Sequence, residues 1–191
     1  PEWRRPTGES SKGRADWVGL VAMSIHIRVP MLPGAERAPW KAIVNGVESE
    51  HFIESNAILL DVLRDQVGTL GLKRGCDMGT CGCCAVQLDG QPRLSCLCLA
   101  REAEDTAITT VEGLADGHHL HPIQQCFAEA GGSQCGFCTP GFLVVCAAFL
   151  ETNVNPTRDQ IKAAIDGNLC RCTGYQQIVD SVRAASMIIT S

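Results

Sequence analysis

Residues 75–84 read GCDMGTCGCC, and this stretch decides how the first half of the chain folds. Cys76, Cys81 and Cys84 have the spacing C-x4-C-x2-C, in which three thiolates can wrap a binuclear iron–sulfur core. The interspersed glycines allow positive φ angles, so that backbone N–H groups can turn toward the sulfides and offset their negative charge. The stretch therefore predicts a tight cluster-binding loop.

A fourth ligand is expected after this loop, in residues 94–100, which read LSCLCLA. We predict a strand here with Cys96 as the ligand, although Cys98 would share its face and spacing alone cannot separate the two. Cys83, beside Cys84, presents the same ambiguity, and we interpret Cys83 and Cys98 as small buried side chains. A four-cysteine zinc site is the other chemistry open to this set, but zinc knuckles usually pair two C-x2-C units.

A second set of cysteines lies in residues 134–138, QCGFC, and residues 167–175, GNLCRCTGY. The C-x-C pair is unusual for zinc, and its combination with a distant C-x2-C is specific. Each pair stands at or near the start of a predicted helix, where free N–H groups and the positive end of the helix dipole suit an anionic cluster. The predicted ligands of a second cluster are Cys135, Cys138, Cys170 and Cys172.

Twelve of the 191 residues are cysteine, and they are bunched too closely for most neighbours to be disulfide partners. Metal-bound thiolates in a reducing compartment explain them better. The net charge of −5 provides no basic stripe for nucleic acid. No run approaches the roughly 20 apolar residues of a membrane span. We therefore predict neither a nucleic-acid partner nor a membrane segment.

Residues 1–38 are rich in proline, glycine, arginine and serine, and they are predicted to form an N-terminal extension. Arg4 and Arg5 resemble a twin-arginine export signal, but the apolar stretch over residues 17–23 is short and distant from them. A polar extension of a cytoplasmic protein is the favoured interpretation. Export of the complex to the periplasm is the less favoured alternative.

Residues 39–117 predict a small α+β domain. Asn45-Gly46 and Asp89-Gly90 each indicate a hairpin between short strands. Between the hairpins, apolar residues recur at helical spacing from Leu59 to Val67, after Asn56 as a suitable N-cap. Residues 107–111 are expected to form the last strand.

Residues 118–191 predict a four-helix domain. Helices are expected over residues 121–130, 140–151, 156–165 and 176–188, three of which have a proline near the start. Three histidines between residues 118 and 121 are interpreted as solvated or interface side chains rather than metal ligands. Cys126 and Cys146 are interpreted as core residues of this domain.

Six motifs together resemble the small iron–sulfur subunit of the molybdenum hydroxylases, and they read GCDMGTCGCCAV, SCLCLA, TTVEGLA, HPIQQCF, QCGFCTPGF and NLCRCTGY. This is the xanthine dehydrogenase family, with its relatives aldehyde oxidoreductase, carbon monoxide dehydrogenase and 4-hydroxybenzoyl-CoA reductase. The resemblance covers about residues 40–186. It implies a β-grasp, plant-ferredoxin-like domain followed by a four-helix-bundle domain that binds a second [2Fe-2S] cluster. Cys83 departs from the family, which usually has a small residue such as alanine there.

The resemblance also implies partners. Electrons would pass from a molybdenum–pterin centre on a large subunit to the helical-domain cluster, then to the ferredoxin-like cluster, and usually to FAD on a medium subunit. Gln134 and Cys172 would lie close to the pterin, although a structural role for the Gln134 amide stays open. We therefore expect an electron-transfer subunit of a molybdenum oxidoreductase whose substrate chemistry takes place on another subunit. A free-standing two-cluster carrier and a structural zinc module are the alternatives.

Overall fold

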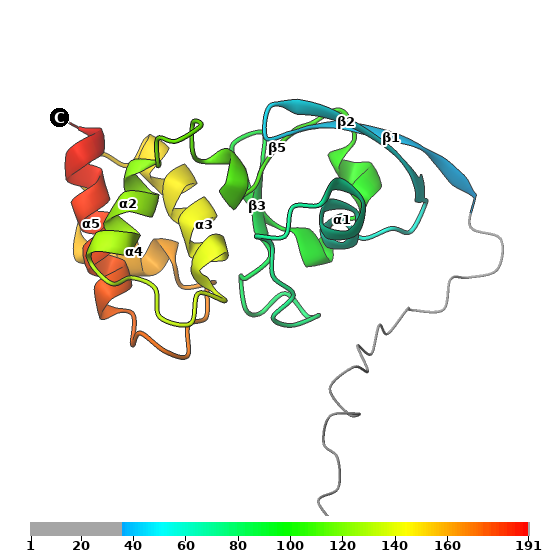
Figure 1. The fold of residues 1–191 in the computed structure, drawn as a ribbon. Coiled ribbons are helices and arrows are strands. Elements are labelled where there is room, and N and C mark those ends of the chain that lie inside the picture. The colour runs from blue at the N-terminus through cyan, green and yellow to red at the C-terminus, as the bar shows by residue number, and fades with distance from the viewer. Residues whose placement is uncertain (1–35, 191) are drawn as a thin grey trace, which may run out of the picture. The chain divides into compact units, whose positions relative to one another are not determined.

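The computed structural model describes residues 36–190, so the predicted extension lies outside the described residues except at its end. A five-stranded sheet occupies the first half of the described chain (Figure 1). Its strands are β1 (Arg37–Val44), β2 (Val47–Glu54), β3 (Ala85–Leu88), β4 (Gln91–Leu94) and β5 (Ala107–Thr109). Their order is β2-β1-β5-β3-β4, in which β1 and β5 are parallel and the other neighbours are antiparallel.

Both predicted hairpins are confirmed, and their turns explain their register. Asn45 and Gly46 have φ values of +51° and +78°, and Asp89 and Gly90 have +47° and +78°. Positive φ at both central residues is the type I′ geometry, whose twist matches that of the flanking strands. The turns therefore set β1 directly against β2 and β3 directly against β4.

A short helical segment packs beneath the arch of β1 and β2 in Figure 1. It consists of α1 (Leu59–Asp61) and a π-helical continuation, η2 (Val62–Val67). Leu59, Leu60 and Leu63 are fully buried on its inner face. The predicted helix is confirmed, and its burial against the sheet gives this half its hydrophobic core.

The start of this helix differs from the prediction, because Ile58 rather than Asn56 occupies the N-cap position. No side chain caps the helix there. Instead, the Leu59 N–H donates to the carbonyl oxygen of Cys98 at 2.9 Å. The first free donor of the helix is thus satisfied by a distant segment, which removes the need for a polar cap.

Four helices form the second half: α2 (Pro122–Glu129), α3 (Thr139–Thr152), α4 (Arg158–Ala164) and α5 (Gln176–Ile189). Their buried side chains make a second hydrophobic core. Two of these helices have a side-chain cap at the N-terminus. His121 Nδ1 accepts from the Ile123 N–H at 3.2 Å at the start of α2, and Thr157 Oγ1 accepts from the Gln160 N–H at 3.3 Å at the start of α4. No helix within residues 36–190 is long and apolar enough to cross a bilayer.

The strand predicted over residues 94–100 is wrong. Strand β4 ends at Leu94, and two 3₁₀ helices follow, η3 (Ser95–Leu97) and η4 (Ala100–Ala103). Ser95 accounts for the turn, because its N–H and its hydroxyl donate to the Cys84 carbonyl oxygen at 3.3 and 2.7 Å. The alternating faces of a strand therefore do not apply to Cys96. A third 3₁₀ helix, η5 (Val111–Gly113), replaces the end of the strand expected over residues 107–111.

The two halves are joined by a buried hydrogen bond. Gln87 on β3 is 4% exposed, and its Nε2 donates to the Val144 carbonyl oxygen on α3 at 3.0 Å. Val111 and Leu114 pack against the helical core, although they precede the helices in the chain. The domain boundary predicted at residue 117 stays a prediction.

Candidate iron–sulfur sites

The loop of residues 75–84 brings Cys76 and Cys81 into contact. The pKa of the Cys76 thiol is lowered to about 6, chiefly because the Met78 N–H donates to its sulfur and also because the Thr80 hydroxyl and the Cys81 thiol bond to it. These donors favour the thiolate over the thiol. The loop therefore prepares Cys76 in the form that binds metal.

Cys84 and Cys96 form a second thiol pair beside the first. Both are buried, at 2% and 8% exposure, and their thiols are close enough that Cys84 affects the pKa of Cys96. The pKa of Cys96 is raised to about 12, chiefly by burial, next by the neighbouring Cys84, and to a smaller extent by Cys76. Cys84 and Cys76 therefore both lie close enough to Cys96 to influence its pKa.

Cys83 and Cys98, the two cysteines that spacing could not separate from the ligands, lie differently. Cys83 is 4% exposed, and its Sγ points to the Cys81 carbonyl oxygen at 3.8 Å. The pKa of Cys83 is raised to about 12, chiefly by burial, next by the neighbouring Cys81, and to a smaller extent by Cys138 and Cys84. Burial likewise raises the pKa of Cys98 to about 11. Cys83 thus also lies beside Cys81 and near Cys84, and the choice of Cys84 and Cys96 as the ligands stays a prediction.

The second set also forms two pairs. Cys138, at the N-cap of α3, lies close enough to Cys170 for that thiol to affect its pKa, and Cys135 affects the pKa of Cys172 in the same way. The pKa of Cys138 is raised to about 12, chiefly by burial and next by Cys170. Burial also raises the pKa of Cys170, but hydrogen bonds from the side chain and the N–H of Thr173 outweigh it, and the net shift is downward.

The Cys170 loop is held by the residues that follow it. The Thr173 hydroxyl donates to Cys170 Sγ at 3.1 Å, and the Cys170 N–H donates to the Tyr175 hydroxyl oxygen at 3.0 Å. Tyr175 has a φ of +69° and is itself the N-cap of α5. The start of α5 therefore fixes the position of one sulfur of the second set.

The pairing of thiols suits a binuclear core. In a [2Fe-2S] cluster two thiolates bind each iron, so four thiolates are needed as two pairs rather than around a single ion. Within residues 36–190, no three His, Cys, Asp or Glu side chains are arranged around one ion position. The thiols of both sets fit the chemistry of a [2Fe-2S] cluster. Cys76, Cys81, Cys84 and Cys96 would hold one cluster, and Cys135, Cys138, Cys170 and Cys172 would hold the other.

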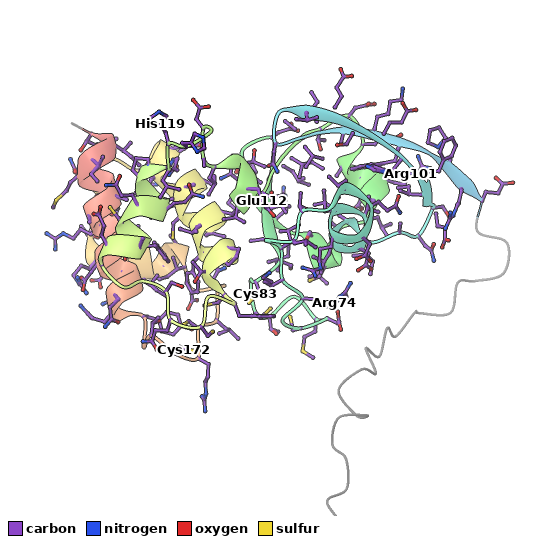
Figure 2. All side chains as sticks on the ribbon, in the orientation of Figure 1. Arg74, Cys83, Arg101, Glu112, His119 and Cys172 are labelled. Carbon is purple, nitrogen blue, oxygen red and sulfur yellow. The ribbon has the colours of Figure 1, made fainter. Side chains whose placement is uncertain are left out.

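The two sets differ in exposure. Cys81, Cys84 and Cys96 are buried, whereas Cys135 and Cys172 are exposed. Figure 2 shows Cys172 on the loop that leads into α5, and Cys83 on the side of the sheet half that faces α3. Gln134 is exposed beside Cys135, and the apolar side chains of Phe137 and Leu169 are 47% and 53% exposed. The second set therefore opens onto a partly apolar surface.

The three histidines and two cysteines that the sequence analysis did not assign as ligands are capping, surface or core residues. His121 caps α2 and lies at intermediate burial, and His118 and His119 are exposed, as the sequence interpretation expected. Cys126 and Cys146 are buried in the helical core, which confirms their interpretation.

Asn168 is the residue that sequence reasoning missed. It is 4% exposed, and its Nδ2 donates to the carbonyl oxygen of Gly82, in the first cysteine loop, at 3.1 Å. No local signal could have found this bond, because the two residues are 86 positions apart in the chain.

Two protein families match this chain. The family described as "2Fe-2S iron-sulfur cluster binding domain" matches residues 39–129, and the family described as "[2Fe-2S] binding domain" matches residues 110–183. The two matches together cover both cysteine sets.

Several known proteins are similar to this chain over most of its length. The nicotinate dehydrogenase small FeS subunit of Eubacterium barkeri is 44% identical over 142 residues, which are 74% of this chain and 90% of the relative. The xanthine dehydrogenase iron-sulfur-binding subunit of Escherichia coli O157:H7 is 44% identical over 73% of this chain and 88% of the relative. Quinoline 2-oxidoreductase from Pseudomonas putida 86 has a TM-score of 0.78 at 40% identity, covering 81% of this chain and 96% of that chain.

Other relatives are much longer. The aldehyde oxidoreductase of Megalodesulfovibrio gigas is 44% identical over 149 residues, but the chain spans only 16% of its length. The same iron–sulfur unit thus occurs both as a small subunit and as part of a larger chain. From its two cysteine sets, its α+β fold and these relatives, the chain belongs to the iron–sulfur subunits of the molybdenum hydroxylase family.

Proposed function

We propose that this chain is an electron-transfer subunit that carries two [2Fe-2S] clusters. It would pass electrons between a molybdenum–pterin centre on a large subunit and FAD, or another acceptor, on a partner subunit. The observation that carries the proposal is the match of two [2Fe-2S] binding families to this chain, one over each cysteine set. When bound, each cluster supplies uptake and release of one electron at a time.

The buried and the exposed residues of the two cysteine sets would have different roles in this electron transfer. The buried thiols of Cys81, Cys84 and Cys96 would hold the first cluster away from water, and the N–H of Met78 would offset its charge. The exposed Cys172 and Gln134 would face the pterin of the large subunit. The apolar side chains of Phe137 and Leu169 would then become buried against that partner and exclude water from the contact.

The compartment and the domain limits are part of the same proposal. Eight thiols that must stay reduced for cluster binding favour a reducing compartment, which we take to be the cytoplasm. We propose a ferredoxin-like domain over residues 39–117 and a helical domain over residues 118–191, preceded by the extension of residues 1–38.

The test is purification of the tagged full-length chain from its native host without oxygen. We expect a larger molybdenum-containing chain to co-purify in equal amount, and two distinct [2Fe-2S] EPR signals to appear on reduction. Recovery of the iron-loaded chain alone would favour a free-standing carrier. Zinc without iron would favour a structural module and would overturn the proposal.

A further inference from the structure

The sheet ends at β2, whose only neighbouring strand among the described residues is β1. On β1, the Lys41 carbonyl oxygen and the Ile43 N–H bond to the chain just before β5, so both groups point away from β2. Opposite residues of antiparallel strands turn together toward or away from each other, so their partners Glu50 and Glu48 turn their own N–H and C=O groups to the free edge. Phe52 follows by the same alternation. Among residues 36–190, no group bonds to the backbone of these three residues on that side.

The opposite edge of the sheet, β4, is closed to a further strand. The Ser95 N–H donates to the Cys84 carbonyl oxygen, and by alternation Pro92 is turned to the free edge of β4. Proline has no N–H to offer, which is a usual protection of an edge strand. Strand β2 has eight residues and no proline. It is therefore the edge of this sheet that can accept another strand.

The side chains of β2 define what such a strand must look like. Glu48, Glu50 and Phe52 are exposed on the outer face of the sheet. On the other face, Ile53 is buried in the core around α1, whereas Val47 is 65% exposed at the rim of that core. A fitting strand would place polar or basic side chains beside the glutamates and apolar side chains beside Val47.

Residues 24–29 have this pattern. They read SIHIRV, without an acidic residue. Three β-branched apolar residues alternate with three polar ones: Ile25, Ile27 and Val29 with Ser24, His26 and Arg28. This alternation is typical of a half-buried strand, and Pro30 follows it as a stop. The segment precedes the described residues, and the chain leads from it directly into β1.

We propose that residues 24–29 add to the free edge of β2 as a further strand of the sheet. The isoleucines then lie on the core face beside Val47, and Arg28 lies on the acidic face near Glu50. In this register the Ile27 N–H donates to the Glu50 carbonyl oxygen. The inference goes beyond the proposed function and does not depend on clusters.

The connection to β1 sets the direction of the added strand. Seven residues, 30–36, lead to Arg37, which pairs with Glu54 at the end of β2. The added strand lies two strand spacings from β1, about 10 Å. Seven residues can span roughly 23 Å, so they can pass the end of β2. The added strand therefore ends beside Glu54, parallel to β2 and antiparallel to β1.

A second copy of β2 is a poorer occupant of this edge. Two copies related by a two-fold axis would keep the same outer face, on which Glu48, Glu50 and Glu54 all lie. Pairing most of the strand would set glutamates opposite one another, which is destabilising. The charge of this face therefore favours the segment that carries Arg28.

The test measures amide hydrogen exchange in the cluster-loaded full-length chain, by mass spectrometry with residue-level fragmentation. The readout is the N–H of Glu48, Glu50 and Phe52. The Ile43 N–H, which donates to the Thr106 carbonyl oxygen at 3.0 Å, is the internal standard and should stay protected in every chain. The unaltered chain is compared with a chain lacking residues 1–29, and is measured over a range of concentrations.

Ile27→Pro is the point variant, because it removes the N–H that would donate to Glu50. Val18→Pro is the matched control, since it makes the same change in the extension outside residues 24–29. We expect the three readout amides to exchange at least about tenfold more slowly in the unaltered chain and in the control than in the deletion and in Ile27→Pro.

Three results would overturn the proposal. Fast exchange of these amides in the unaltered chain would show an unoccupied edge. Protection that survives the deletion, or that appears only at high protein concentration, would assign the edge to another segment or to a second copy. Equal loss of protection in Val18→Pro and Ile27→Pro would show that residues 24–29 are not the strand.

Discussion

Gly141, in the first turn of α3, lies against the backbone of the first cysteine loop. A Cβ added there would lie 2.3 Å from the Gly82 carbonyl oxygen and 3.1 Å from the Cys83 Cα. Both neighbours are backbone atoms, so no side chain can rotate away to make room. Gly141→Ala therefore sets the preference of a helix for alanine against a clash between the two halves.

The clash should outweigh the helix preference. Alanine in place of glycine inside a helix is worth up to about 1 kcal/mol. Overpacking a tight contact costs about 1–3 kcal/mol, and a 2.3 Å approach to backbone belongs at the upper end of that range. The expected balance is a loss of about 1–2 kcal/mol of unfolding free energy. For a chain of this size, the melting temperature would fall by roughly 2–8 °C.

Thermal unfolding of the cluster-loaded chain, followed by circular dichroism, measures this effect. Gly167→Ala is the matched control, because a Cβ at Gly167 meets nothing within 4 Å and its φ is not in the left-handed range. The control should melt within a degree or two of the unaltered chain, since surface substitutions usually change stability by no more than about 0.5 kcal/mol. A melting temperature that stays level or rises in Gly141→Ala would refute the close contact between α3 and the Gly82 backbone.

Three further substitutions test single residues. Cys170→Ser should remove the second cluster and leave the first, so that one EPR signal disappears; two unaltered signals would contradict the ligand assignment. Cys83→Ala should leave both clusters in place, and loss of half the iron would show that Cys83 rather than its neighbour is the ligand. Burial lowers the pKa of His121, whose neutral Nδ1 caps α2, so the stability it contributes is present above the usual histidine pKa and is lost as pH falls below it. His121→Asn should keep a cap on α2 and reduce the change in unfolding free energy with pH by up to about 1 kcal/mol. The control His119→Asn, at an exposed site, should leave that change as it is in the unaltered chain. An equal pH dependence in the two variants and the unaltered chain would disprove the role of His121.

Local signals were sufficient wherever the structure depends on neighbouring residues. Asn45-Gly46 and Asp89-Gly90 predicted both hairpins, because only residues that tolerate positive φ can make a two-residue turn. The helix starts near Pro122 and Thr157 were equally readable, since a missing N–H or a hydroxyl acceptor suits the first turn. Cysteine spacing predicted the two ligand sets, and that assignment stays a prediction.

Prediction from sequence failed where a distant partner decides the local structure. Residues 94–100 have the alternation of a strand, but Ser95 bonds to the Cys84 carbonyl and bends the chain into a 3₁₀ turn. Ile58 begins a helix without a polar cap because the Cys98 carbonyl receives the first donor. Neither partner could be inferred from the neighbouring residues, because each is set by how the cysteine loop folds back on the sheet.

The contacts between the two halves share one property, which explains why the sequence does not predict them and why they fix the position of one half against the other. Gln87 and Asn168 each reach across to a main-chain carbonyl, and Gly141 lies against main-chain atoms. A main-chain partner can be supplied by any residue type, so the sequence gives no sign of it. It is also fixed by the fold more firmly than a side chain, because it has no rotamers of its own. The relative position of the two cysteine sets therefore depends on main-chain atoms whose positions are set by the sheet and by α3. Substitutions at Gln87, Gly141 and Asn168 should shift the two sets relative to each other before they disturb either set alone.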